Sequence, residues 1–234
     1  MPKPHLVLLP GLNNTRAVFD DLVPLLTEVA DILVLEFPAV ENLDAIARDM
    51  LQRCPPQFNL CAFSFGGYVA AAMLEQAPQR IERLALIGAG PGADKPERRG
   101  TREGAIARAL AGEYEAMVKA GSASSFHPDN LSNAGLMARR DAMVADYGAA
   151  RYVAHSRAAM ERPARYHVLA GLTKTLLVMA GERDNLMPLA EMERTAAAAP
   201  KARIVVVPGA GHVVPMEQPA VAAAELRQWI AATD

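Results

Sequence analysis

The chain has 234 residues, of which 51% are hydrophobic and 21% are charged, and its formal net charge is −2. This length and composition suit one globular domain with a large buried core, or one core with an insertion, and they exclude a disordered chain. The near-zero charge and an aromatic content of only 5% argue against nucleic-acid and anionic-membrane partners.

The first apolar run covers residues 5–9 and ends at Pro10-Gly11. It is too short for a secretory signal and far too short to span a bilayer, so we expect a cytoplasmic protein. The two cysteines, Cys54 and Cys61, form neither a disulfide framework nor a repeated metal-ligand spacing. The sequence therefore predicts no metal site.

Strands and helices alternate along the first 92 residues. Continuous apolar runs predict strands, and apolar residues three or four positions apart predict helices. The first helix contains Pro24, which can kink it, and Asn42 is placed to cap the second. The predicted strands are residues 5–9, 32–35, 58–63 and 84–87, and the predicted helices are residues 18–29, 43–51 and 67–76. This alternation is typical of a parallel sheet covered by helices on both faces.

The alternation stops at about residue 93. Up to residue 168 the sequence predicts only helices, at 106–119, 131–147 and 149–162, and we interpret this part as an inserted helical cap. The alternation returns with strands at 176–179 and 204–207 and helices at 189–199 and 217–230. We therefore expect an α/β core of about six strands in residues 1–92 and 169–234, with a cap in residues 93–168.

Ser64 lies at the junction between a predicted strand and a predicted helix. A serine on such a sharp turn needs small residues two positions away on each side, and Ala62 and Gly66 meet that need. Ser64 is also the only one of six serines that lies in the predicted core. Taken alone, the motif fits a nucleophile and an incidental serine at a tight junction about equally well.

A histidine and an aspartate follow later strands of the same sheet. His212 lies on a glycine-rich loop after the strand at 204–207, where a general base can reach a nucleophile on a neighbouring strand. Asp184 follows the strand at 176–179, where its carboxylate can orient that histidine. A surface histidine is the alternative for His212, and Glu182 is the competing carboxylate for Asp184.

Two backbone amides are candidates for an oxyanion hole. The residue after the serine, Phe65, supplies one amide, and Leu12, after the first strand, supplies the other. The alternative for Pro10-Gly11 is a simple turn. Serine, acid and histidine nevertheless follow one another in a fixed order, each directly after a strand.

The chain at this point resembles the α/β-hydrolase superfamily over nearly its whole length. The resemblance is carried by the segments Leu9-Pro-Gly-Leu12, Ala62-Phe-Ser-Phe-Gly-Gly67, Gly181-Glu-Arg-Asp184, Gly211-His212 and Glu217-Gln-Pro219. The last two segments look most like small capped members: carboxylesterases, enol-lactonases and carbon–carbon bond hydrolases. The resemblance implies a Ser-His-Asp triad without a cofactor. Two positions depart from the family pattern, because Ala62 replaces the usual elbow glycine and Pro10 the usual histidine.

The substrate pocket is less well defined by the sequence. The apolar side chains of Phe126, Met137, Met160 and Val213 could line an acyl or aromatic site, although most apolar residues of the cap are expected to pack its helices. Residues 93–168 contain 12 basic and 9 acidic residues, a net charge of +3. This charge fits an anionic substrate and a solvated helical surface equally well.

We expect a serine hydrolase that cleaves a small carboxylic ester or lactone through an acyl-enzyme. Two alternatives remain open: a hydrolase of carbon–carbon bonds in diketones, and a ligand-binding sensor with residual hydrolase activity. The expected partner is a small molecule, with no nucleic acid and no membrane. Both a monomer and a homodimer fit the sequence.

Overall fold

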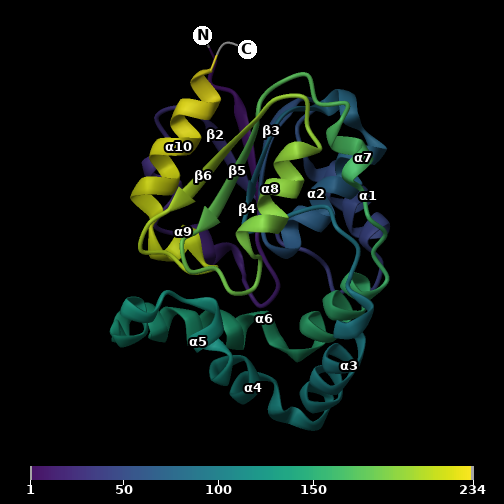
Figure 1. Cartoon of the computed structure of the whole chain (residues 1–234), viewed down its shortest axis with the longest axis vertical. Coiled ribbons are helices and arrows are strands. Elements are labelled where there is room, and N and C mark those ends of the chain that lie inside the picture. The colour runs from purple at the N-terminus through teal and green to yellow at the C-terminus, as the bar shows by residue number, and fades with distance from the viewer. Residues whose placement is uncertain (1, 233–234) are drawn as a thin grey trace.

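A parallel sheet forms the centre of the protein. The computed structural model describes residues 2–232, and within these residues the sheet has six strands in the order β2-β1-β3-β4-β5-β6, all parallel (Figure 1). The strands are β1 His5–Leu9, β2 Asp31–Val34, β3 Phe58–Phe63, β4 Ile81–Ile87, β5 Leu176–Gly181 and β6 Ala202–Val207. The predicted α/β class and the predicted number of strands are confirmed.

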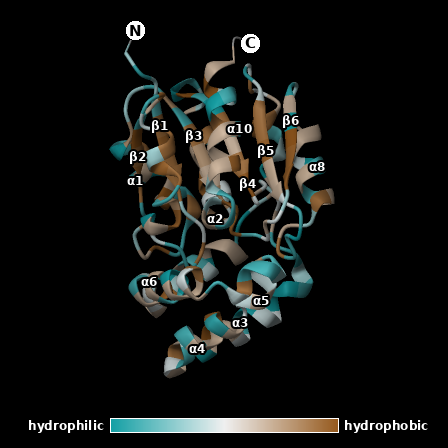
Figure 2. Ribbon diagram, turned by 90° about the vertical axis from the view of Figure 1, so that its left-hand side faces the viewer, coloured by the Kyte–Doolittle hydropathy of each residue, from teal (hydrophilic) through white to brown (hydrophobic). Residues whose placement is uncertain are grey.

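Helices cover both faces of this sheet. One face is covered by α1 Leu43–Arg53, α2 Phe65–Gln76 and α8 Leu189–Ala197, and the other by α9 Val214–Glu217 and α10 Pro219–Ala231. Alternate residues of a strand point to opposite faces, so in β3 Leu60 and Ala62 join the first core and Cys61 and Phe63 the second. The central strands are buried on both sides and are the most hydrophobic part of the ribbon (Figure 2).

The helix predicted over residues 18–29 is wrong. The chain instead forms two short 3₁₀ helices, Arg16–Phe19 and Val23–Leu25. Pro24 lies in the first turn of the second one, because proline lacks an N–H and cannot continue a helix through that point. Val18, Phe19, Leu22 and Leu26 are still buried, which explains why the spacing looked helical, whereas Leu25 is exposed. The prediction for Asn42 is confirmed, since its side chain accepts a hydrogen bond from the amide of Ala45 at the start of α1.

The segment between β4 and β5 consists of helices and loops, with no strand among its residues, all of which the structure describes. Its helices are α3 Arg99–Arg108, α4 Tyr114–Ala120, α5 Ser122–Ser125, α6 Ala134–Met160 and α7 Tyr166–Leu169. We call residues 99–160 the cap and its helices α3 to α6 the cap helices. They lie beyond the carboxyl ends of the strands (Figure 1). The two helices predicted at 131–147 and 149–162 are the two arms of α6, which is kinked at Gly148 (φ 76°). The division of the chain into a core and a cap domain stays a prediction.

None of the helices in the described part of the chain combines the length and apolar character that a bilayer crossing requires.

Candidate active site

The turn from β3 into α2 presents Ser64 at the carboxyl edge of the sheet. Ser64 has φ 52° and ψ −117°, a conformation that residues other than glycine rarely adopt and that is common in functional turns. A Cβ atom on Gly66 would lie 2.7 Å from the carbonyl oxygens of both Leu9 and Pro10. The turn can therefore pack against the end of β1 only because Gly66 has no side chain.

His212 and Asp184 meet Ser64 in one hydrogen-bonded chain. His212 Nε2 lies 2.8 Å from Ser64 Oγ, and His212 Nδ1 lies 2.8 Å from Asp184 Oδ2. The imidazole and carboxylate side chains are only 8% and 2% exposed. A carboxylate can only accept, so the proton of the neutral ring resides on Nδ1 and leaves Nε2 free to accept from the serine hydroxyl.

Asp184 is itself held in place by the loop after β5. Its second oxygen, Oδ1, accepts hydrogen bonds from the amides of Leu186 and Met187 at 2.9 and 2.8 Å. These two bonds satisfy the oxygen that does not face His212. Glu182, the competing carboxylate, is exposed and accepts the Gly209 amide at 3.1 Å, away from His212.

Gly88, at the end of β4, is a site residue that sequence reasoning missed. It has φ 52°, and a Cβ atom there would lie 3.1 Å from two atoms of the His212 ring and 3.2 Å from Asp184 Oδ2. The absence of a side chain on Gly88 therefore makes room for the histidine–aspartate pair. A glycine directly after a strand that neighbours the serine strand was the available signal.

Glu217 belongs to a segment that carries the family resemblance, but it was not predicted as a site residue, and it connects the loop of His212 to the cap. Its Oε1 accepts from the amides of Gly211 and Val213 at 2.9 and 3.1 Å, on either side of the histidine. Its Oε2 accepts from the amide of His127 and from Asn130 Nδ2 at 2.7 and 2.8 Å. The His212 amide also donates to the carbonyl of Ser125, at 2.7 Å. The loop that carries the histidine is thus hydrogen-bonded to the cap at several points.

The candidate oxyanion residues, Leu12 and Phe65, line the same cavity as Ser64 and His212. The loop that carries Leu12 is fastened by side chains: Asn14 Nδ2 donates to the Leu12 carbonyl at 2.6 Å, and Arg140 Nη1 donates to the Asn13 carbonyl at 2.5 Å. Tyr114, from the cap, donates to Asn13 Oδ1 at 3.1 Å. The loop position therefore depends on contacts from the cap.

This cavity has a volume of about 220 Å³ and is lined by both polar and apolar residues. Besides the residues already named, it is lined by Tyr68, Arg98, Arg102, Ala159, Leu186 and Met187. Of the four side chains predicted to form the pocket, only Val213 lines it. Phe126 and Met137 pack into the core on the α9–α10 face of the sheet, and Met160 borders a separate groove between α3 and α6. Apolar cap residues are used here for helix packing.

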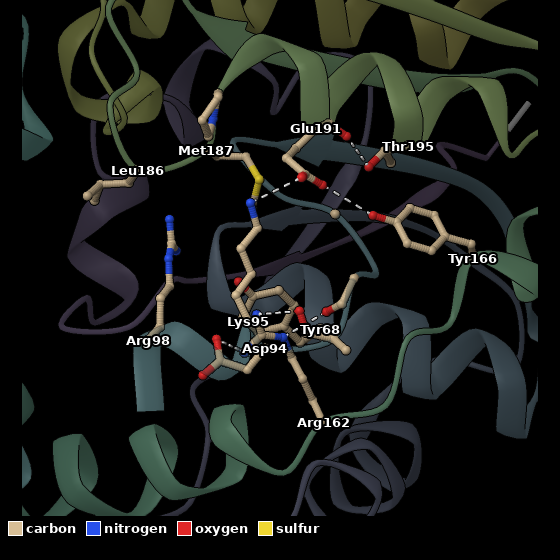
Figure 3. Close-up of a pocket in the computed structure, with 14 residues that line it drawn as sticks. Tyr68, Asp94, Lys95, Arg98, Arg162, Tyr166, Leu186, Met187, Glu191 and Thr195 are labelled. Atoms are coloured by element: carbon tan, nitrogen blue, oxygen red, sulfur yellow. Dashed lines mark hydrogen bonds and ion pairs between the residues drawn. The ribbon is translucent and has the colours of Figure 1, made fainter. Parts of the chain in front are cut away.

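A second, smaller cavity of about 50 Å³ adjoins the first and shares Tyr68, Arg98, Leu186 and Met187 with it (Figure 3). The remaining charged side chains of this cavity are paired with one another. Arg162 lies 3.1 Å from Asp94 and above the ring of Tyr68, and Lys95 lies 3.5 Å from Glu191. This cavity contains neither Ser64 nor His212.

His155, on α6, is fully buried next to the turn that carries the serine. Its ring stacks on Phe65 at a centroid distance of 5.1 Å, contacts the Tyr147 hydroxyl through Nδ1, and forms a hydrogen bond from Nε2 to the Pro38 carbonyl at 2.8 Å. Burial lowers the pKa of His155, so the ring is neutral at neutral pH. It supports the residue that follows the serine and does not reach the cavity.

The comparisons with known proteins agree with this architecture. The model of the alpha/beta hydrolase family matches residues 6–226. A pimeloyl-[acyl-carrier protein] methyl ester esterase of Nitrosomonas europaea is 29% identical over 96 residues, and the match covers 38% of this chain and 38% of that relative. The chain thus matches well under half of the length of this curated relative.

Two solved structures are similar over almost the whole chain. A thermophilic esterase from Thermogutta terrifontis, with malate bound, has a TM-score of 0.89 and 24% identity and covers 97% of this chain and 89% of its own. The enol-lactonase from Burkholderia xenovorans LB400 has a TM-score of 0.89 and 19% identity, with coverage of 99% and 93%. At these identities the likeness concerns the fold.

Proposed function

Because the chain belongs to the alpha/beta hydrolase family, we propose that it is a serine hydrolase that cleaves a small carboxylic ester or lactone. The observation that carries the proposal is the continuous hydrogen-bonded chain from Ser64 Oγ through His212 to Asp184, with 2.8 Å at each step. An activated serine needs a base in contact with it and a third group that orients the base. In this proposal His212 is the base and Asp184 is the group that orients it.

Acylation follows from the positions of these atoms. His212 Nε2 takes the hydroxyl proton as Ser64 Oγ forms a bond to the carbonyl carbon of the substrate. The amides of Leu12 and Phe65 hold the oxyanion that develops, and Asp184 stabilises the charged ring without taking its proton. When the bond between the carbonyl carbon and the leaving oxygen breaks, His212 Nε2 donates its proton to that oxygen. The alcohol leaves, and the acyl group stays on Ser64. In a lactone the leaving oxygen remains attached to the acyl chain.

Deacylation uses the same groups in reverse. A water molecule gives a proton to His212 Nε2 and attacks the acyl carbon, and collapse of the second oxyanion returns the proton to Ser64. The carboxylic acid then leaves. The cap helices, in this proposal, form the roof of the cavity and limit the access of bulk water. Relatives described as esterases and as an enol-lactonase support the choice of ester and lactone bonds.

The test compares Ser64→Ala with Ser125→Ala. Ser125 lines the same cavity, but its hydroxyl donates only to the Gly121 carbonyl, so this variant is a matched control. We expect a fluorophosphonate to label the wild type and Ser125→Ala at Ser64, and Ser64→Ala to lose both labelling and turnover of ethyl esters. Labelling that persists in Ser64→Ala would refute the proposed nucleophile. Labelling of Ser64 without turnover of esters or lactones would instead favour a ligand-binding sensor.

A further inference from the structure

Arg140 is a buried cation in the cavity of the proposed nucleophile, and within residues 2–232 it has no ionic partner. It lies on α6, is 6% exposed, and lines the same cavity as Ser64 and His212. Its Nη1 donates to the Asn13 carbonyl and to Asn14 Oδ1, at 2.5 and 3.1 Å. Its Nε is buried without a hydrogen-bond partner, and among the described residues the guanidinium forms no ion pair.

The two titratable groups that act on Arg140, Tyr114 and Asp141, do not neutralise it. The neighbouring carboxylate, Asp141, is partly exposed and paired with Lys119 at 2.7 Å. The phenol of Tyr114 lies near, but burial raises its pKa, so it carries no charge. Burial also lowers the pKa of Arg140 to about 10, a value at which the guanidinium remains protonated at neutral pH.

The whole lining of the cavity shows the same imbalance. Three arginines line it, Arg98, Arg102 and Arg140, whereas no aspartate or glutamate is among its lining residues. Arg102 is compensated from outside the cavity by both oxygens of Asp94, at 2.8 and 3.1 Å, and Arg98 is exposed to solvent. Arg140 is therefore the buried charge of the cavity that lacks compensation. Burying an unpaired charge is strongly unfavourable unless a ligand completes the site.

We propose that Arg140 binds a carboxylate of the substrate, so that the preferred substrates are small esters or lactones that carry a second, free carboxylate group. This inference rests on the proposed function, since it assigns the substrate class of the same site. A guanidinium is well suited to a carboxylate because its planar donors match the two oxygens. The cavity volume of about 220 Å³ is below the range for drug-sized ligands, and so it fits half-esters of short dicarboxylic acids.

The contacts of Arg140 also allow a purely structural role. Through Asn13 and Asn14 the guanidinium holds the loop that carries Leu12. A structural role would affect every ester equally, whereas recognition of a carboxylate affects only esters that carry one. The experiment must therefore compare matched substrates.

The probes are the monoethyl esters of succinate, glutarate and adipate, each paired with a neutral ethyl ester in which an isopropyl group replaces the free carboxylate. Hydrolysis is followed by pH-stat titration in the wild type, Arg140→Met, Arg140→Lys and the control Arg139→Met. Arg139 is the adjacent arginine, but it is half-exposed and paired with Asp21 at 2.6 Å, outside the cavity. Circular dichroism checks the fold of each variant.

We expect the wild type to prefer at least one anionic ester over its neutral partner by roughly 10-fold or more in kcat/KM. Arg140→Met should abolish this preference, mainly through a higher KM for the anionic ester, and Arg140→Lys should restore part of it. Arg139→Met should behave as the wild type. Equal losses for both members of a pair in Arg140→Met, or a wild-type preference for the neutral esters, would overturn the inference while the proposed hydrolase stands. If the wild type and Ser64→Ala hydrolyse all probes equally slowly, the proposed function itself fails.

Discussion

The Glu217 carboxylate offers the sharpest test of how the site is held together. It accepts four hydrogen bonds, two from the loop of His212 and two from the cap. In Glu217→Gln one of the two oxygens becomes an NH₂ group, which is a donor. Two of the four protein donors would then face another donor, either beside His212 or at the cap.

The magnitude follows from the number of bonds. A hydrogen bond to a charged group contributes roughly 1.5–3 kcal/mol, and Glu217 is only half-buried, so the lower value applies. The loss of two bonds should therefore lower the free energy of unfolding by about 3 kcal/mol. A displacement of His212 by about 1 Å should in addition reduce kcat by up to about 100-fold.

The assay combines urea denaturation with the rate at which a fluorophosphonate labels Ser64. In the proposed mechanism labelling requires His212 as the base, so the labelling rate per folded molecule reports the position of His212 separately from stability. Glu182→Gln is the matched control, since Glu182 accepts a single amide of the same loop, that of Gly209, from an exposed position. If Glu217→Gln lost stability but kept the wild-type labelling rate, Glu217 would hold only the cap, and if it matched Glu182→Gln in both measurements the reasoning would be refuted.

Three further changes test neighbouring features. Gly88→Ala places a methyl group against His212 and Asp184, so ester turnover should fall at least about 10-fold while the circular dichroism spectrum is retained, and unchanged turnover would contradict the close contact. Gly66→Ala places a methyl group against two carbonyl oxygens, and its free energy of unfolding should fall by about 1–3 kcal/mol in urea titrations; an unchanged midpoint would argue against that packing. His155 has a pKa below its ordinary value of 6.5 in the folded protein, so its unfolded form binds a proton first on acidification. The stability that neutral, buried His155 contributes is complete above about pH 6.5 and is lost as the pH falls through the lowered pKa. In thermal melts between pH 8 and pH 5, the melting temperature of His155→Phe should therefore fall less on acidification than that of the wild type.

Features set by local chemistry could be predicted from the sequence. The strand Phe58–Phe63 has the predicted bounds, because a continuous apolar run between turns leaves few alternatives. The Asn42 cap is also confirmed, because a helix cap depends only on a side chain and an amide three residues away. Ser64, Asp184 and His212 were predicted from their positions after strands, and the structure brings the three side chains into contact.

Features that depend on distant contacts could not be predicted. The spacing of Val18, Phe19, Leu22 and Leu26 correctly predicted burial, but short 3₁₀ helices bury the same positions as an α-helix would. The pocket predictions for Phe126, Met137 and Met160 relied on side-chain type, which does not distinguish the inside of a cavity from helix packing. The net positive charge of residues 93–168 did not single out Arg140, because its hydrogen-bond partners are more than 120 positions away.

The hydrogen bond from the His212 amide to the Ser125 carbonyl has a consequence for local unfolding. Because the cap donates and accepts hydrogen bonds on the loop of His212, we expect a fluctuation that detaches α5 to release that loop as well. The cap and the histidine loop should then exchange their amide hydrogens as one cooperative unit, with a lower opening free energy than the strands of the sheet. At moderate denaturant the protein would thus lose activity while its sheet is still folded, and the lifetime of the catalyst would be set by its cap.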